Sequence, residues 1–302
     1  MSGIDGLFPG FEQRTIEVAA GVEIAATVGG NGPPLLLLHG HPQTRVIWHR
    51  VAPALAATHT LVMADLRGYG DSAKPRGEPG HANYAKRVMA QDQLTLMAHL
   101  GFHRFDVLAH DRGARVAHRL ALDHPAAVSR LILLDVAPTL AMYEQTSQAF
   151  ARAYWHWFFL IQPAPTPERL IEADPAAYVL EVMGRRSAGL APFDPRALAE
   201  YQRCLALPGG AQGVCEDYRA AAGIDLLHEQ QDRDAGRRLD MPVLALWGEE
   251  GVVHRCFRPL DEWRRLARHV EGRALPCGHY LAEEAPDALL AQVQPFLARE
   301  LA

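Results

Sequence analysis

Short and uniformly apolar runs recur along the chain, and turn residues bound each of them. Strands that are covered on both faces of a mostly parallel sheet have this pattern, because neither face meets water. The pattern predicts buried strands at Leu35–Leu38, Thr60–Ala64, Phe105–Ala109, Leu131–Leu134 and Val243–Trp247.

Segments with helical spacing lie between and after these runs. They predict helices at Val46–Ala57, Tyr84–Leu100, Arg112–Asp123 and Leu260–Ala267, and a closing helix at Pro286–Arg299. Alternating strands and helices predict an α/β fold, a mostly parallel sheet flanked by helices and joined by right-handed crossovers.

The alternation breaks between Ala137 and Arg238. This segment is rich in proline and aromatic residues, as in YWHWFFLIQPAPTP, and has helical spacing without clear buried strands. We therefore expect residues 1–136 and 239–302 to form the core domain and residues 137–238 to form an inserted helical cap domain.

Composition excludes several classes of protein. The 302 residues include 49% hydrophobic and 22% charged residues, which is typical of a globular protein with a sizeable core. The net charge of −5 and the lack of a long basic cluster argue against a nucleic-acid partner. No apolar run approaches the ~20 residues that span a bilayer, so we expect no membrane partner.

The four cysteines predict neither a metal site nor a disulfide framework. They have no CxxC spacing and no zinc-like arrangement with histidine. Reduced thiols in a chain of this size indicate the cytoplasm. The cysteines are Cys204, Cys215, Cys256 and Cys277.

Chemically suggestive residues follow the ends of several predicted strands. The segment His39–Pro42 follows the first strand, Asp111 and Asp135 each follow a later one, and His279 follows a last strand-like segment. Ligands of open α/β sheets bind at the carboxyl ends of the strands. We therefore expect these residues to converge on one site.

Ala109-His110-Asp111-Arg112-Gly113 has the pattern small-x-nucleophile-x-small. Small flanking residues let the chain turn sharply from strand to helix, so that the central side chain is exposed to substrate. The following helix N-terminus favours an ionised carboxylate. The alternative is that Asp111 only caps this helix. The HGHP motif upstream and the GH motif downstream favour the nucleophile.

With these motifs, the sequence resembles the α/β-hydrolase family and, more closely, the fluoroacetate (haloacetate) dehalogenases. The resemblance rests on LLLLHGHPQT, ADLRGYGDS, HDRGARV, LDVAPT, YWHW, CEDYRA, LALWG and GHYLAEEAPD. The first, second and last of these motifs are shared with haloalkane dehalogenases and epoxide hydrolases. The combination of HDRGAR with HW and CEDYRA is more specific to the fluoroacetate dehalogenases.

The resemblance implies hydrolytic dehalogenation of short 2-haloacids such as haloacetates, without a metal or an organic cofactor. Asp111 would attack the carbon that bears the halogen and form an ester. His279 would activate the water that cleaves this ester. The backbone N–H groups of His41 and Arg112 would stabilise the oxyanion.

The resemblance also implies two sets of anion-binding residues. Arg112 and Arg115 match the positions that bind the substrate carboxylate, for which guanidinium has suitable geometry. Because 28 of the 30 basic residues are arginines, the alternative for each is a solvated helix residue. His156, Trp157 and Tyr218 match the halide-binding positions, with cap packing as the alternative. Packing is the role expected of the other aromatic residues in this stretch, Tyr154, Trp155, Phe158 and Phe159.

His279 needs an acid to orient it. The resemblance to LDVAPT favours Asp135, which follows the strand after the nucleophile. Glu249 and Glu250 are the alternative, because they follow LALWG, where many α/β hydrolases carry this acid.

Two departures from the family concern the pocket. His41 stands where the family commonly has Phe, and Met183-Gly184-Arg185-Arg186 replaces a slightly longer segment with a further aromatic residue. These departures leave the choice of haloacid open.

The sequence leaves two alternative functions open, and it also leaves the oligomeric state open. An epoxide hydrolase would use the same Asp-His-acid machinery with two cap tyrosines, and a non-catalytic binding protein could share the fold. A homodimer is compatible with the sequence. The cap offers Tyr143, Tyr154, Tyr178, Tyr201 and Tyr218.

Overall fold

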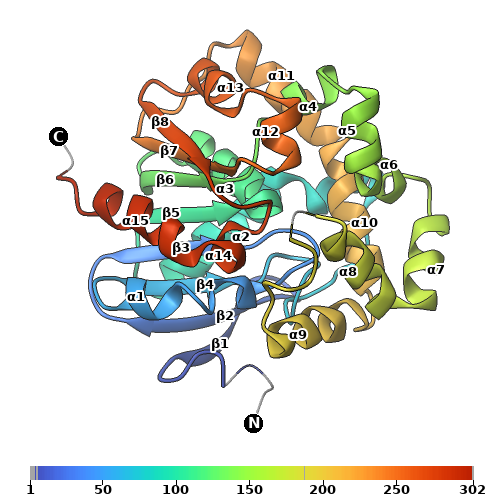
Figure 1. Ribbon diagram of the computed structural model, residues 1–302, viewed down its shortest axis with the longest axis horizontal. Coiled ribbons are helices and arrows are strands. Elements are labelled where there is room, and N and C mark those ends of the chain that lie inside the picture. The colour runs from blue at the N-terminus through green and yellow to red at the C-terminus, as the bar shows by residue number, and fades with distance from the viewer. Residues whose placement is uncertain (1–3, 5, 187, 301–302) are drawn as a thin grey trace.

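The computed structural model describes residues 4, 6–186 and 188–300. Its centre is an eight-stranded sheet in the order β1-β2-β4-β3-β5-β6-β7-β8, which runs from the bottom to the top of Figure 1. Strands β3 to β8 are parallel, and β1 and β2 pair antiparallel at one edge. The strands are β1 (Glu12–Ala19), β2 (Val22–Gly30), β3 (Pro34–Leu38), β4 (Thr60–Ala64), β5 (Phe105–His110), β6 (Val128–Leu134), β7 (Val243–Gly248) and β8 (Val270–Leu275).

The five predicted strands are confirmed as β3 to β7, with ends that differ by three residues or fewer. The sequence pattern missed the hairpin of β1 and β2. Most β1 residues are exposed, so this edge strand has no apolar run to reveal it. The α/β fold class is confirmed, because parallel strands alternate with helices on both faces of the sheet.

Helices α1 (Ala52–Ala56) and α15 (Pro286–Leu297) lie in front of the sheet in Figure 1, and α2 (Lys86–His99) and α3 (Asp111–Asp123) lie behind it. The prediction of one helix over Val46–Ala57 was wrong. A 3-10 turn, η1 (Arg45–Trp48), ends before α1 begins, and Pro53 lies in the first turn of α1. Proline lacks an N–H, so it fits the start of a helix and breaks an interior.

The remaining core helices complete the layers around the sheet. Helix α13 agrees with the predicted Leu260–Ala267 to within one residue. These elements are η2 (Pro79–Tyr84), α12 (Val252–Cys256), α13 (Pro259–Leu266) and α14 (Leu281–Glu284).

The described residues between β6 and β7 form helices and no strand, and these helices gather at the right of Figure 1. The expected helical insertion is therefore present, while its status as a domain of its own stays a prediction. Its helices are α4 (Thr139–Glu144), α5 (Gln148–Ala153), α6 (Trp155–Leu160), α7 (Thr166–Ala173), α8 (Pro175–Gly184), α9 (Pro195–Leu205), α10 (Gly210–Ala221) and α11 (Ile224–Asp234).

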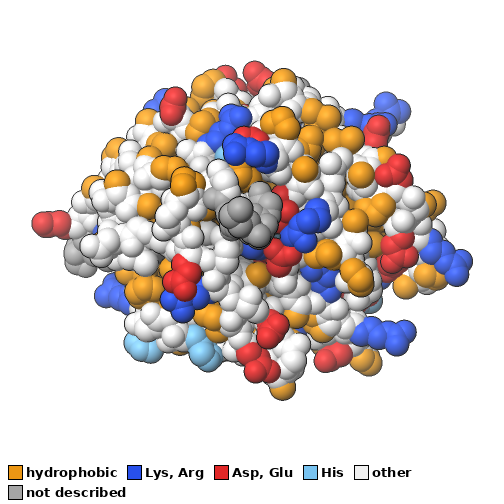
Figure 2. Space-filling view, turned by 90° about the horizontal axis from the view of Figure 1, so that it is seen from below, with side chains coloured by type: hydrophobic (Ala, Val, Ile, Leu, Met, Phe, Trp, Pro, Cys, Tyr) orange, Lys and Arg blue, Asp and Glu red, His pale blue; other side chains and the backbone are white. Residues whose placement is uncertain are grey.

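Basic and acidic side chains are interspersed on the face shown in Figure 2, without a large field of one charge. Among the helices that are described, none combines the length and apolar character needed to cross a membrane.

Candidate active site

Asp111 lies at the sharp junction of β5 and α3. Its φ of 47° places a non-glycine residue in the left-handed region, which is strained. The turn brings Gly113 against the end of β3, where its N–H donates to the carbonyl of His39 at 2.8 Å. A Cβ at Gly113 would lie 2.4 Å from this oxygen. The small residue of the sequence pattern is therefore required by packing.

The carboxylate of Asp111 is buried, but its surroundings stabilise the ionised form. Its Oδ1 accepts a hydrogen bond from the backbone N–H of His41 at 3.0 Å. Burial alone would raise the pKa of Asp111, but the interactions with His110, Arg186 and Arg112 outweigh it and hold the pKa below its ordinary value. Asp111 is therefore a buried carboxylate that stays ionised.

His279 stands between two carboxylates. Its Nδ1 lies 2.6 Å from Oδ2 of Asp135, and its Nε2 lies 3.9 Å from Oδ2 of Asp111. The backbone N–H of Gly248 fixes the other Asp135 oxygen at 3.0 Å. Of the two candidate acids, the geometry brings Asp135 to His279, whereas Glu249 and Glu250 are exposed.

Burial governs the titration of this pair. It lowers the pKa of His279 well below 6.5, and the nearby charge of Arg186 lowers it further. Burial also raises the pKa of Asp135, which makes this carboxyl a stronger acceptor for the Nδ1–H of a neutral imidazole. A neutral His279 has the protonation state of a general base.

Arg112 and Arg115 are both buried, so the alternative of solvated helix residues does not fit. Arg112 donates from Nε to Asp217 at 2.7 Å, and Nη1 of Arg115 donates to Oγ1 of Thr139 at 2.9 Å. Each guanidinium keeps one buried nitrogen without a partner among the described residues, Nη1 in Arg112 and Nε in Arg115.

Two of the three expected halide residues present buried donors beside these arginines. The guanidinium of Arg115 lies 4.7 Å from the ring centre of Trp157, and that of Arg112 lies 4.0 Å from that of Tyr218. The indole Nε1 of Trp157 and the hydroxyl of Tyr218 have no partner within the described chain. His156 differs, because its Nε2 lies 2.8 Å from Nη2 of Arg186.

Sequence reasoning missed the places of three residues. Tyr154 was expected to pack, or to serve as one of the cap tyrosines of an epoxide hydrolase, but neither expectation placed its hydroxyl 3.4 Å from Nδ1 of His279. Asp217, within the CEDYRA motif, is the buried acceptor for Arg112. Tyr178 contacts Nε2 of His41 through its hydroxyl at 3.1 Å. Helical spacing in the cap did not show which of these side chains face the core.

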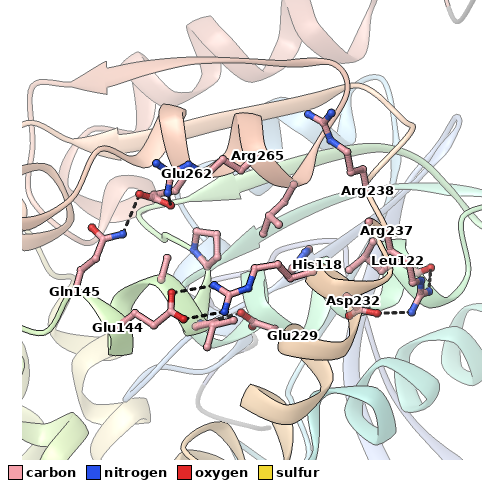
Figure 3. A pocket seen from close by; sticks show the side chains of 16 residues that line it. His118, Leu122, Glu144, Gln145, Glu229, Asp232, Arg237, Arg238, Glu262 and Arg265 are labelled. Carbon is pink, nitrogen blue, oxygen red and sulfur yellow. Dashed lines mark hydrogen bonds and ion pairs between the residues drawn. The ribbon is translucent and has the colours of Figure 1, made fainter.

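A pocket of about 330 Å³ reaches this site from the cap side, and Tyr154, Arg186 and His279 are among the residues that line it. A second pocket, of about 240 Å³, lies between α4, α11 and α13 (Figure 3). Its charged side chains largely pair with one another, as Arg233 does with Glu144 at 2.9 Å. None of the candidate catalytic residues lines this second pocket, so the chemistry belongs to the first.

The site should keep its activity below the pH at which an ordinary histidine is protonated. A lowered pKa means that His279 stays a neutral base to lower pH, so the acid limb of kcat should lie below 6.5. The limb of kcat/KM, which reports the free enzyme, should lie lower still if it follows Asp111. Initial rates between pH 4 and 8 measure both limbs, and a kcat limb above 6.5 would contradict the neutral base.

The chain is similar to known proteins over almost its whole length. The family model described as the alpha/beta hydrolase fold matches residues 33–286. A fluoroacetate dehalogenase from Burkholderia sp is 45% identical over 293 residues, which cover 97% of this chain and 95% of the relative. A soluble epoxide hydrolase from Corynebacterium sp. (strain C12) is 33% identical and covers 92% of this chain and 94% of its own length.

A solved structure is similar over almost the same span. The crystal structure of a protein from Nostoc sp PCC 7120, described as an alpha/beta hydrolase, superimposes with a TM-score of 0.93 at 51% identity. It covers 96% of this chain and 99% of its own.

Proposed function

Because the chain belongs to the α/β-hydrolase family, we propose that it hydrolyses the carbon–halogen bond of short 2-haloacids, such as haloacetates, to a 2-hydroxy acid and halide. The observation that carries the proposal is a group of buried donors, near an ionised carboxylate, that have no partner among the described residues. These donors are Nη1 of Arg112, Nε of Arg115, Nε1 of Trp157 and the hydroxyl of Tyr218. The similarity to a fluoroacetate dehalogenase supports the same substrate class.

The donors suit an anion with two ends. A 2-haloacid carries a carboxylate at one end and becomes a halide ion at the other. Arg112 and Arg115 would take the carboxylate oxygens, since charge-assisted hydrogen bonds to guanidinium are strong. Trp157 and Tyr218 would donate to the halide, which must lose its hydration shell as it leaves.

In the first step, Oδ2 of Asp111 would attack the substrate carbon in line with the carbon–halogen bond. The new C–O bond forms as the halide leaves with the bonding electrons, so no proton is needed. The product is an ester of Asp111. The N–H of His41 already contacts Oδ1, which becomes the carbonyl oxygen of this ester. The N–H of Arg112 is the proposed second donor to it.

In the second step, Nε2 of His279 would take a proton from water as its oxygen adds to the Asp111 carbonyl carbon. The 3.9 Å between Nε2 and Oδ2 of Asp111 is too long for a direct hydrogen bond, which fits a base that acts through water. Asp135 stabilises the resulting imidazolium. As the tetrahedral adduct collapses, the imidazolium of His279 would give its proton to the leaving oxygen of the 2-hydroxy acid. The carboxylic acid left on Asp111 would then lose its proton to solvent, which restores the carboxylate.

Halide release tests this proposal directly. Fluoroacetate, chloroacetate and bromoacetate should each release halide with an equal amount of glycolate, and the Asp111→Asn variant should release none. The proposal would be overturned if the wild type released halide from none of the three haloacetates.

Epoxide hydrolysis is the second candidate function. Two observations favour it: the hydroxyl of Tyr218 is buried without a partner among the described residues, and a soluble epoxide hydrolase is 33% identical. Arg112 already pairs with Asp217, but an uncharged epoxide would leave the buried cation of Arg115 without an ion-pair partner among the described residues, which is costly. We therefore expect styrene oxide to be hydrolysed far more slowly than chloroacetate.

The indole donor should matter most for fluoride. Trp157→Phe keeps an aromatic ring beside Arg115 but removes the N–H, so the rate on fluoroacetate should fall at least about tenfold more than the rate on bromoacetate. Parallel halide-release assays measure the ratio. A uniform loss on both substrates would indicate disturbed packing instead.

A further inference from the structure

We propose that Arg186 is a further specificity-determining residue, which donates to the departing halide and takes the place of the Nε2–H of His156. This inference rests on the proposed dehalogenation. It assigns a role to a cap arginine at the point where the sequence departs from the family pattern.

Arg186 is buried, and it forms no ion pair with the residues that the structure describes. It follows α8, is only 8% exposed, and its guanidinium lies 5.0 Å from the ring centre of Tyr154 and 5.5 Å from that of Tyr280. Its recorded contacts within the described residues are with His156, Tyr154 and Tyr280, none of which carries a carboxylate. A buried cation is costly unless an anion compensates it. In the free site the charge of Arg186 interacts with the ionised carboxylate of Asp111. Alkylation would neutralise that carboxylate, so the departing halide would become the anion beside Arg186.

The contact with His156 determines which group can donate. A guanidinium carries only donors, so Nη2 of Arg186 must donate to Nε2 of His156 across their 2.8 Å separation. Nε2 then carries no hydrogen and cannot donate to a halide. Burial, reinforced by the charge of Arg186, lowers the pKa of His156, so the imidazole is neutral and this arrangement is consistent.

Arg186 is linked to the other proposed halide donors through His156, and its charge interacts with Tyr218. The ring of His156, to which Arg186 is hydrogen-bonded, lies 6.0 Å from that of Tyr218, and the ring of Trp157 lies 6.2 Å from that of Tyr218. Nη1 of Arg186 is buried and has no partner in the described part of the chain. Arg186 also lines the pocket that reaches His279, which places its charge on the path of the anions.

A charged hydrogen-bond donor at the halide site changes the relative rates at which the different halides leave. Fluoride is the smallest halide and holds its hydration most strongly, so a charge-assisted hydrogen bond stabilises it more than it stabilises bromide. Arg186 should therefore raise the rate of C–F cleavage relative to C–Br cleavage. It should also bind halide as a product.

The test is the rate of the first halide release, measured in a His279→Asn background so that ester hydrolysis does not mask it. Arg186→Gln should lose at least about tenfold more activity on fluoroacetate than on bromoacetate. Arg196→Gln is the matched control, because it removes the same charge from an exposed cap arginine that pairs with Asp194 at 2.8 Å and does not line the pocket that reaches His279. The control should leave the fluoro-to-bromo ratio unchanged.

Two further measurements keep the test decisive. Arg186→Lys preserves the charge and should recover part of the ratio even if Arg186→Gln folds poorly. Chloride should inhibit turnover by Arg186→Gln less well than turnover by the wild type. The variant should need at least about tenfold more chloride for the same inhibition. This measurement uses the His279-containing enzyme with bromoacetate.

The outcomes separate this inference from the proposed function. An equal loss on all three haloacetates with a raised KM would place Arg186 at the substrate carboxylate and overturn the inference, as would an unchanged ratio. A wild type that releases no halide would overturn the proposed function itself.

Discussion

Replacing His279 with Asn should leave a protein that releases about one halide per active site and then stops. Alkylation of Asp111 needs no base, because the carboxylate is ionised and the halide leaves without a proton. Ester hydrolysis does need a base, since water is a poor nucleophile until its proton is taken, and losing that base should slow turnover by about a thousandfold. Quenched-flow halide assays should show the burst and the stop.

The trapped ester should be visible by mass. After reaction with chloroacetate, the His279→Asn variant should gain one carboxymethyl group on the peptide that contains Asp111. Asp111→Asn is the control and should show neither the burst nor the adduct. A burst without an adduct on this peptide would mean that another residue is the nucleophile.

Isotopic oxygen distinguishes attack by Asp111 from attack by water. In a single wild-type turnover in heavy-oxygen water, the label should enter the Asp111 carboxylate, because water attacks the enzyme's carbonyl carbon. Label that appears only in glycolate would show that water attacks the substrate and that Asp111 acts as a general base.

The strands that carry the site could be predicted from sequence because burial on both faces leaves an apolar run. Strand β5 is buried throughout and ends at Asp111, so its run located the nucleophile. Strand β1 is exposed along most of its length and had no such signal. What the pattern reports is burial, so it finds central strands and misses a partly solvated edge hairpin.

The residues contributed by the core were predictable for a related reason. The carboxyl ends of parallel strands meet at one edge of a sheet, so Asp111, Asp135 and His279 could be placed together from their positions after strands. The same argument does not reach the cap. No strand order positions the cap helices, and the helical spacing of their residues does not indicate which face packs against the core domain.

Arg186 shows this limit most clearly. It follows a helix in the segment between α8 and α9, where neither strand order nor helical period fixes the direction of a side chain. In sequence it was only a departure from the family pattern beside the similar Arg185. The structure separates the two, because Arg185 is 70% exposed and Arg186 is buried beside His156.

Arg115→Leu should reduce kcat/KM on chloroacetate by about 30-fold, which corresponds to a loss of ~2 kcal/mol in transition-state stabilisation. Leucine preserves apolar contact with Trp157 but removes the buried Nε that has no partner among the described residues. The variant also frees the hydroxyl of Thr139, so thermal unfolding should be measured alongside activity. Arg152→Leu removes an exposed cap arginine and should leave the rate unchanged.

The uncharged analogue separates a clamp for carboxylate from a merely structural arginine. Wild type should act on chloroacetamide far more slowly than on chloroacetate, because Arg112 already pairs with Asp217 but the amide leaves the buried cation of Arg115 without an anion. In Arg115→Leu this preference should shrink, since that cation is gone and the acid loses more than the amide does. Equal losses on acid and amide would assign Arg115 to packing around Trp157 and leave the carboxylate without its second guanidinium.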